Sequence, residues 1–227
     1  MSSINDEFLK SIVASFPPIE FAFAYGSGAI SQKGYEDTTI ASSSSSSEDA
    51  PQLDIIFAVQ DPLTWHEANL KQNPQHYSAL QYFGAAYITK VQDQGPGLYF
   101  NPFVDFNGLQ LKYGVVSTKR LLKDLTEWDS LYLSGRLHKP VRFIEHLASP
   151  VLIKQMSEAL SFNRTAAFSL ACLMMTPPFS ELELYQRIAA LSYTGKFIFY
   201  CSYIFSYIYI FSLSLSFSLS GVAHVHM

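Results

Sequence analysis

Short apolar runs alternate with amphipathic stretches along the first 140 residues. Residues 1–20 repeat apolar side chains at helical spacing and end at the Pro17-Pro18 pair, which predicts a short helix that stops there. Phe21–Tyr25 and Leu53–Val59 are continuous apolar runs of strand length. Each is bounded by polar or glycine-containing sequence, so both are predicted to be buried strands.

The alternation continues as far as residue 134, with recognisable start and turn signals. In order, the pattern predicts a helix over 62–70 that Asp61 caps, a helix over 76–92, strands over 98–106 and 109–116 joined by an Asn107-Gly108 turn, and a helix from 117 or 118 to about 134. The remaining pattern is helical over 150–175 and 180–192. The expected fold class is therefore α/β (or α+β): a sheet with helices over 1–140, followed by a small helical domain over 141–195.

Two segments depart from this pattern. Residues 36–51 include six consecutive serines and are predicted to form a flexible surface insertion. Residues 196–227 form an apolar tail in which serine is interleaved, and Phe197–Val222 is long enough to cross a bilayer of about 30 Å. Its weakly hydrophobic Ser-rich half and scattered tyrosines argue against a transmembrane helix. A membrane-spanning helix and a segment that does not span a membrane both remain open.

Composition narrows the class of function. The 227 residues are 48% hydrophobic and carry a net charge of −4, which leaves no basic footprint for a nucleic acid. Cys172 and Cys201 are too few for a disulfide framework and show no metal-ligand spacing. The acidic start, MSSINDEFLK, is neither a secretory signal nor a visible transit peptide.

Candidate chemistry lies where the first two predicted strands meet a glycine loop. Gly26, Ser27 and Gly28 follow the first strand, and Asp54 lies inside the second. Glycines let backbone amides approach phosphate oxygens closely, and Ser27 adds a hydroxyl donor. A carboxylate inside an apolar strand needs a cation, a metal ion or several hydrogen-bond donors, and carboxylate oxygens are ligands that Mg²⁺ prefers. This combination favours a magnesium-dependent nucleotidyltransferase over a simple structural turn.

The remaining ligands are less well determined. Nucleotidyltransferases usually carry a second acidic residue two positions after the first, and here that position is Ile56. Asp61 could supply a metal ligand or simply cap a helix, and Asp105 could be a distal carboxylate or an ordinary hairpin residue. Lys112 could bind a nucleotide phosphate or lie on the solvent face of its strand.

Other polar residues allow two interpretations. His66 and His76 offer no zinc spacing and are expected on helix surfaces. Arg136 and Lys139 lie near a helix end, where they could contact phosphate or complement the helix dipole.

Several longer motifs occur in a fixed order along the chain. They are FAYGSGA around Gly26, LDIIFAVQDPLTWHEANLKQNPQHYS at 53–78, GLYFNP at 97–102, LKYGVVS at 111–117, LYLSGRLHKPV at 131–141 and ELELYQRIAALSYTG at 181–195. Together, from about Phe16 to Gly195, they resemble the mitochondrial translocator assembly and maintenance family, the mitochondrial phosphatidate cytidylyltransferases.

This resemblance implies a nucleotidyltransferase domain followed by a partial, helical, winged-helix-like domain. It also implies an enzyme that makes CDP-diacylglycerol and pyrophosphate from CTP and phosphatidic acid, at the head of cardiolipin synthesis. The implied location is peripheral, on the matrix side of the mitochondrial inner membrane. On matching positions, Gly26, Ser27 and Gly28 would hold the CTP phosphates and Asp54 would hold Mg²⁺.

The chain departs from the family after Gly195, where members continue into a long, mostly polar region with a membrane-binding segment. Here FIFYCSYIFSY follows instead, which suggests a truncated or aberrant form. A transcript that runs on past Gly195 into polar sequence would support this reading. Two alternatives remain: a catalytically inactive inner-membrane assembly factor, and a nucleotidyltransferase with a different acceptor, such as a sugar phosphate, a protein or RNA.

Overall fold

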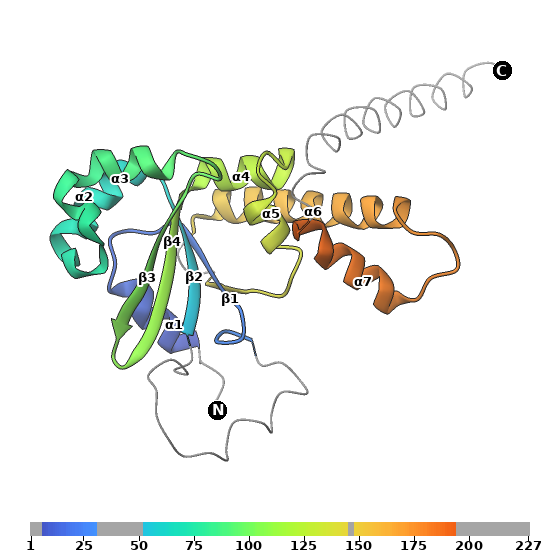
Figure 1. Ribbon diagram of the computed structural model, residues 1–227, viewed down its shortest axis with the longest axis horizontal. Coiled ribbons are helices and arrows are strands. Elements are labelled where there is room, and N and C mark those ends of the chain that lie inside the picture. Colours follow the sequence, from blue (N-terminus) through green and yellow to red (C-terminus); the bar gives the residue numbers. More distant parts are fainter. Residues whose placement is uncertain (1–5, 31–51, 145–147, 194–227) are drawn as a thin grey trace, which may run out of the picture.

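The computed structural model describes residues 6–30, 52–144 and 148–193 (Figure 1). These ranges contain a mixed sheet in the strand order β3-β4-β2-β1-β5. Its strands are β1 (Phe21–Tyr25), β2 (Gln52–Val59), β3 (Leu98–Phe106), β4 (Leu109–Ser117) and β5 (Arg142–Ile144). Strands β2 and β4 run parallel, and the other neighbours are antiparallel. The predicted α/β class is confirmed.

Helices lie on both faces of this sheet. They are α1 (Asp6–Ala14), α2 (Pro62–Gln72), α3 (Gly84–Gln92), α4 (Thr118–Glu127), α5 (Tyr132–Arg136), α6 (Pro150–Leu173) and α7 (Glu181–Ala190). Short 3₁₀ turns cover Pro74–His76, Ala79–Phe83 and Leu191–Tyr193.

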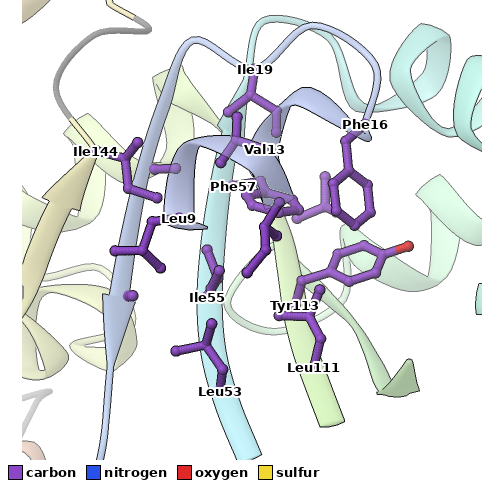
Figure 2. Close-up of a cluster of buried hydrophobic side chains, with 14 of the residues drawn as sticks. Leu9, Val13, Phe16, Ile19, Leu53, Ile55, Phe57, Leu111, Tyr113 and Ile144 are labelled. Atoms are coloured by element: carbon purple, nitrogen blue, oxygen red, sulfur yellow. The ribbon is translucent and has the colours of Figure 1, made fainter. Parts of the chain in front are cut away.

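Alternate residues of β2 point into two separate cores, as the two-residue period of a strand requires. On one face, Leu53, Ile55 and Phe57 pack beneath α1 and the segment after it (Figure 2). On the other face, Ile56 and Ala58 pack with residues from α4, α5 and α6. Asp54 shares the second face, so helices α4 to α6 determine what surrounds its carboxylate.

Most predicted elements are confirmed, including the hairpin turn, where Asn107 and Gly108 both have positive φ. The prediction of a helix over 76–92 is wrong in its first half, which contains 3₁₀ turns. Helix α3 begins only at Gly84, which has φ 78°. The helix expected to reach residue 134 ends at Glu127, because Trp128 turns into the left-handed region at φ 54°.

The boundary expected at residue 140 falls just before β5, which pairs with β1 at the edge of the sheet. Helix α6 then packs its Leu152 and Met156 against the same core as Phe23. The predicted serine-rich insertion at 36–51 and the apolar tail at 196–227 lie outside the described residues. Among the residues that are described, no helix is both long and apolar enough to cross a membrane. The winged-helix-like arrangement stays a prediction.

Candidate active site

Three polar side chains form a row across the sheet. In the strand register, Tyr25 of β1 lies opposite Asp54 of β2, which lies opposite Lys112 of β4. Directly opposed residues in adjacent strands project to the same face. The structure therefore brings together two residues that the sequence proposed separately, Asp54 and Lys112, beside the end of β1.

The Gly26-Ser27-Gly28 loop continues directly from this row. Gly26 has φ 80°, and its carbonyl accepts hydrogen bonds from the backbone N–H groups of Ala29 and Ile30, both at 3.1 Å. A Cβ atom on Gly26 would lie 3.3 Å from Asp54 Oδ2, and one on Gly28 would lie 2.2 Å from the backbone oxygen of Gln52. Glycine is thus needed for the loop to pass this close to β2.

The Asp54 carboxylate is incompletely satisfied. Its Oδ1 atom is buried and has no hydrogen-bond partner among the described residues, and the Lys112 ammonium lies 4.0 Å away. Burial raises the pKa of Asp54, while Lys112 and Arg136 oppose that rise. An unpartnered carboxylate oxygen next to a glycine loop has the chemistry of a metal ligand.

Asp54 fits Mg²⁺ as a single protein ligand. The described residues contain no group of three His, Cys, Asp or Glu side chains that could hold a metal. Mg²⁺ commonly uses only one or two carboxylates and takes its other ligands from substrate phosphates and water. Asp54 beside the Gly26-Ser27-Gly28 loop is compatible with that pattern and does not fit an all-protein metal cage.

The other proposed carboxylate ligands have structural roles instead. Asp61 caps α2, accepting a hydrogen bond from the Thr64 backbone N–H at 3.1 Å, and it lies past the far end of β2 from Asp54. Asp105 accepts a hydrogen bond from the Gly108 backbone N–H at 3.1 Å within the hairpin. Ile56, where a second acid was expected, is buried in the core on the Asp54 face.

Sequence reasoning missed the aromatic groups that border the row. The Arg136 guanidinium lies 4.1 Å from the centroid of the Tyr25 ring, and Lys112 lies 4.9 Å from that of Phe100. Tyr132 packs edge-on to Phe100 with ring centroids 6.4 Å apart. The position of Tyr25 directly before Gly26 was the available signal, but nothing in the sequence paired it with an arginine 111 positions later.

A buried carboxylate, Asp124 of α4, fixes the start of α5. Its two oxygens accept hydrogen bonds from the backbone N–H groups and hydroxyls of Ser130 and Ser134 at 2.7–3.0 Å. They also accept from the backbone N–H groups of Leu131 and Leu133, both at 3.0 Å. Six donors around one carboxylate hold α5, and with it Arg136, in a defined place.

The surface position expected for His66 is wrong. His66 is fully buried, with Nδ1 2.8 Å from the Tyr77 hydroxyl and Nε2 2.8 Å from Gln92 Oε1. His76 is partly buried, with Nδ1 3.2 Å from the Tyr113 hydroxyl. Both belong to a polar network in the core beside α2, away from the Asp54 face.

Comparison with known proteins shows the family of this chain. Residues 9–202 match the model of the family described as phosphatidate cytidylyltransferase, mitochondrial. Proteins of that name from Rattus norvegicus and Dictyostelium discoideum are 43% and 41% identical over 191 and 197 residues, which is 83% and 84% of this chain. These alignments cover 53% and 46% of the relatives, so the chain spans about half the length of the curated relatives it matches. This chain belongs to the mitochondrial phosphatidate cytidylyltransferase family.

Proposed function

We propose that this chain transfers the cytidylyl group of CTP to phosphatidic acid, forming CDP-diacylglycerol and pyrophosphate. The observation that carries the proposal is the Asp54 oxygen that has no hydrogen-bond partner among the described residues, beside the Gly26-Ser27-Gly28 loop. Membership of a family named for this reaction supplies the identity of the two substrates. The low net charge favours a lipid acceptor over RNA.

The reaction divides between residues that bind phosphate and a residue that holds the metal. A phosphate oxygen of phosphatidic acid attacks the α-phosphorus of CTP; a new P–O bond forms, and the bond to the β-phosphate oxygen breaks. The loop amides and the Ser27 hydroxyl bind the triphosphate, and Lys112 adds positive charge. Mg²⁺, held by Asp54, would neutralise charge on the triphosphate and on the departing pyrophosphate.

No strong general base is required by this chemistry. The acceptor phosphate is already an anion, so it needs orientation and relief from repulsion by the triphosphate. Positioning and charge neutralisation therefore supply most of the rate enhancement. This agrees with a site whose polar groups are lysine, arginine, tyrosine and one aspartate.

We also propose that the chain acts in mitochondria, peripherally on the matrix side of the inner membrane, in cardiolipin synthesis. Support for the organelle comes from the relatives, which are named mitochondrial. The finer placement follows from the resemblance alone. Fractionation of mitochondria with antibodies to the chain, before and after carbonate extraction, tests it.

Conversion of labelled CTP to CDP-diacylglycerol is the direct test of the activity. The assay uses Mg²⁺ and liposomes that contain phosphatidic acid and cardiolipin. We expect Asp54→Ala to lower the rate by about 100-fold or more, because the metal loses its protein carboxylate. The matched control is Asp61→Ser, which removes a carboxylate but keeps a side chain that can cap α2.

Three results would contradict the proposal in whole or in part. An unaltered rate in Asp54→Ala would show that this carboxylate has no role in the reaction. A folded chain that neither binds Mg²⁺-CTP nor forms CDP-diacylglycerol would favour the inactive assembly factor. Cytidylyl transfer to a soluble acceptor without liposomes would keep the nucleotidyltransferase chemistry and change its substrate.

A further inference from the structure

We propose that Arg136 is a phosphate-binding residue, contributed by α5 to the Gly26-Ser27-Gly28 loop. The inference rests on the proposed function and extends its binding site beyond the residues that the motif identified. The ligand chemistry is a phosphate oxyanion, from the triphosphate of CTP or the headgroup of phosphatidic acid.

The position of Arg136 places its charge beside the loop. Its guanidinium carbon lies 4.1 Å from the centroid of the Tyr25 ring, and Tyr25 immediately precedes Gly26. Stacking on an aromatic face leaves the in-plane N–H groups of a guanidinium available to bind a bidentate anion. A tyrosine ring within about 6 Å also stabilises the cation itself.

Arg136 is half-buried, and its contact with the Tyr25 ring leaves one buried donor without a hydrogen bond to any described residue. Its Nε atom is buried and has no hydrogen-bond partner in the described part of the chain. Within the same part, no carboxylate lies within 4.0 Å of its guanidinium nitrogens. Buried donors are nearly always satisfied, so an unsatisfied donor at the border of a site points to a ligand.

The local charge balance also favours an anion. The Lys112 ammonium lies 4.0 Å from Asp54 Oδ1, and Arg136 lies over the ring of Tyr25, the residue directly opposite Asp54 in the adjacent strand. Two cations around one carboxylate leave a net positive charge at the loop. The alternative role, stabilising the dipole of α5, does not explain the buried Nε, and α5 has only five residues.

The experiment measures binding of inorganic triphosphate with Mg²⁺ by calorimetry, which does not depend on turnover. We expect Arg136→Gln to weaken binding by about 10- to 100-fold, as for the loss of a charge-assisted hydrogen bond. Arg136→Lys should bind with intermediate affinity, because it keeps the charge but not the planar fork. Arg164→Gln is the matched control, since it removes the same charge from an exposed position on α6.

A second arm identifies the source of the phosphate. Phosphatidic acid in phosphatidylcholine vesicles replaces triphosphate, and binding of the same variants is measured by co-sedimentation. If Arg136→Gln weakens only the binding of triphosphate, the residue binds CTP. If it weakens only the binding of the vesicles, the residue binds the acceptor phosphate. Thermal unfolding without ligand confirms that each variant is folded.

Equal binding of the wild type and Arg136→Gln in both arms would overturn the inference. So would a wild-type chain that binds neither probe. A wild type that binds triphosphate through Arg136 but makes no CDP-diacylglycerol would leave the inference standing and remove the proposed reaction.

Discussion

Gly26 and Gly28 are two residues apart, but different constraints require glycine at each. Gly26 has a positive φ and lies against the Asp54 side chain, which can shift slightly. Gly28 lies against the backbone of Gln52, at a spacing that no Cβ atom can adopt. Only the second constraint requires the loop or the strand itself to move.

Gly28→Ala is therefore expected to weaken Mg²⁺-CTP binding severely, by about 100-fold, because the displaced loop no longer directs its amides at phosphate. Equilibrium dialysis with labelled CTP measures this. Gly108→Ala is the control: its φ of 81° adds strain of about 1–2 kcal/mol, but no atom lies within 4 Å of the new Cβ. Unaltered affinity in Gly28→Ala would show that the loop does not bind the nucleotide.

His66 makes the stability of the protein sensitive to acid. Gln92 donates from Nε2 to the Gly97 carbonyl at 3.2 Å, so its Oε1 accepts from His66 Nε2. His66 Nδ1 then accepts from the Tyr77 hydroxyl, an arrangement that suits a neutral ring. Burial lowers the pKa of His66 from 6.5 to about 4.

The unfolded chain therefore binds a proton at His66 below about pH 6.5, before the folded chain does. Stability is expected to fall as pH drops from 6.5 towards 4, by up to about 3 kcal/mol from this residue. Urea unfolding at pH 7 and pH 5 measures the loss. The His66→Gln variant should be less stable than the wild type at pH 7, but its free energy of unfolding should fall less between pH 7 and pH 5. An equal fall in the wild type and the variant would contradict the assignment.

The unusual environment of Asp54 could be predicted from sequence, because a carboxylate in an apolar strand requires a special partner. The absence of a second acid could not be explained in that way. A Cβ atom on Gly114 of β4 would lie 2.8 Å from Ile56 Cδ1 and 2.8 Å from Phe100 Cε1. Ile56 thus packs across Gly114 against β3, a contact between three strands that no local pattern reveals.

At the scale of elements, strands β1 to β4 and the β3–β4 turn were predictable, whereas strand β5 and the end of α4 were not. The Asn107-Gly108 signal fixes the β3–β4 register locally. The break between α4 and α5 is different, because Trp128 and Leu131 adopt left-handed conformations that their residue types disfavour. Hydrogen bonds from residues 130–134 to Asp124 hold this turn. The spacing of apolar residues does not reveal them, and the predicted helix therefore continued through the turn.

Asp124→Asn tests that role. An amide presents only one acceptor and adds donors opposite the N–H and O–H groups of residues 130–134. We expect a loss of about 3–5 kcal/mol in unfolding free energy, measured in urea. Asp129→Asn is the control, since Asp129 forms exposed ion pairs with Arg120 and Lys123 at 3.2 and 3.3 Å. This substitution should lower the unfolding free energy by at most about 1 kcal/mol. Similar losses in both variants would contradict the assignment.

In the whole molecule, α6 holds the region around α5, which carries Arg136 at the border of the candidate site. Asn163 of α6 is fully buried; its Oδ1 accepts from Trp128 Nε1 at 2.7 Å and from His138 Nε2 at 3.0 Å. Its Nδ2 donates to the Ser134 carbonyl at 3.0 Å. One side chain thus joins α6 to α5 itself and to a residue before it and a residue after it.

Asn163→Ala should lower the unfolding free energy by about 2–4 kcal/mol, because two buried polar groups and one partly buried group lose their hydrogen bonds to Asn163. The same variant should weaken triphosphate binding if α5 contributes Arg136 to the site. Ser161→Ala, at an exposed position on the same helix, is the control for both measurements. A destabilised variant with unaltered affinity would separate α6 from the site.

The dependence of α5 on α6 has a consequence for the order in which the chain is made. A ribosome releases the Gly26-Ser27-Gly28 loop first, Asp54 and Lys112 next, and the Asn163 that holds α5 some fifty residues after Lys112. A nascent chain that ends before α6 already has its glycine loop, its carboxylate and the Asp124 that places the start of α5, but it lacks the Asn163 contacts that complete the positioning of Arg136. Nucleotide bound early would be held loosely, and tight binding would report that synthesis has passed α6.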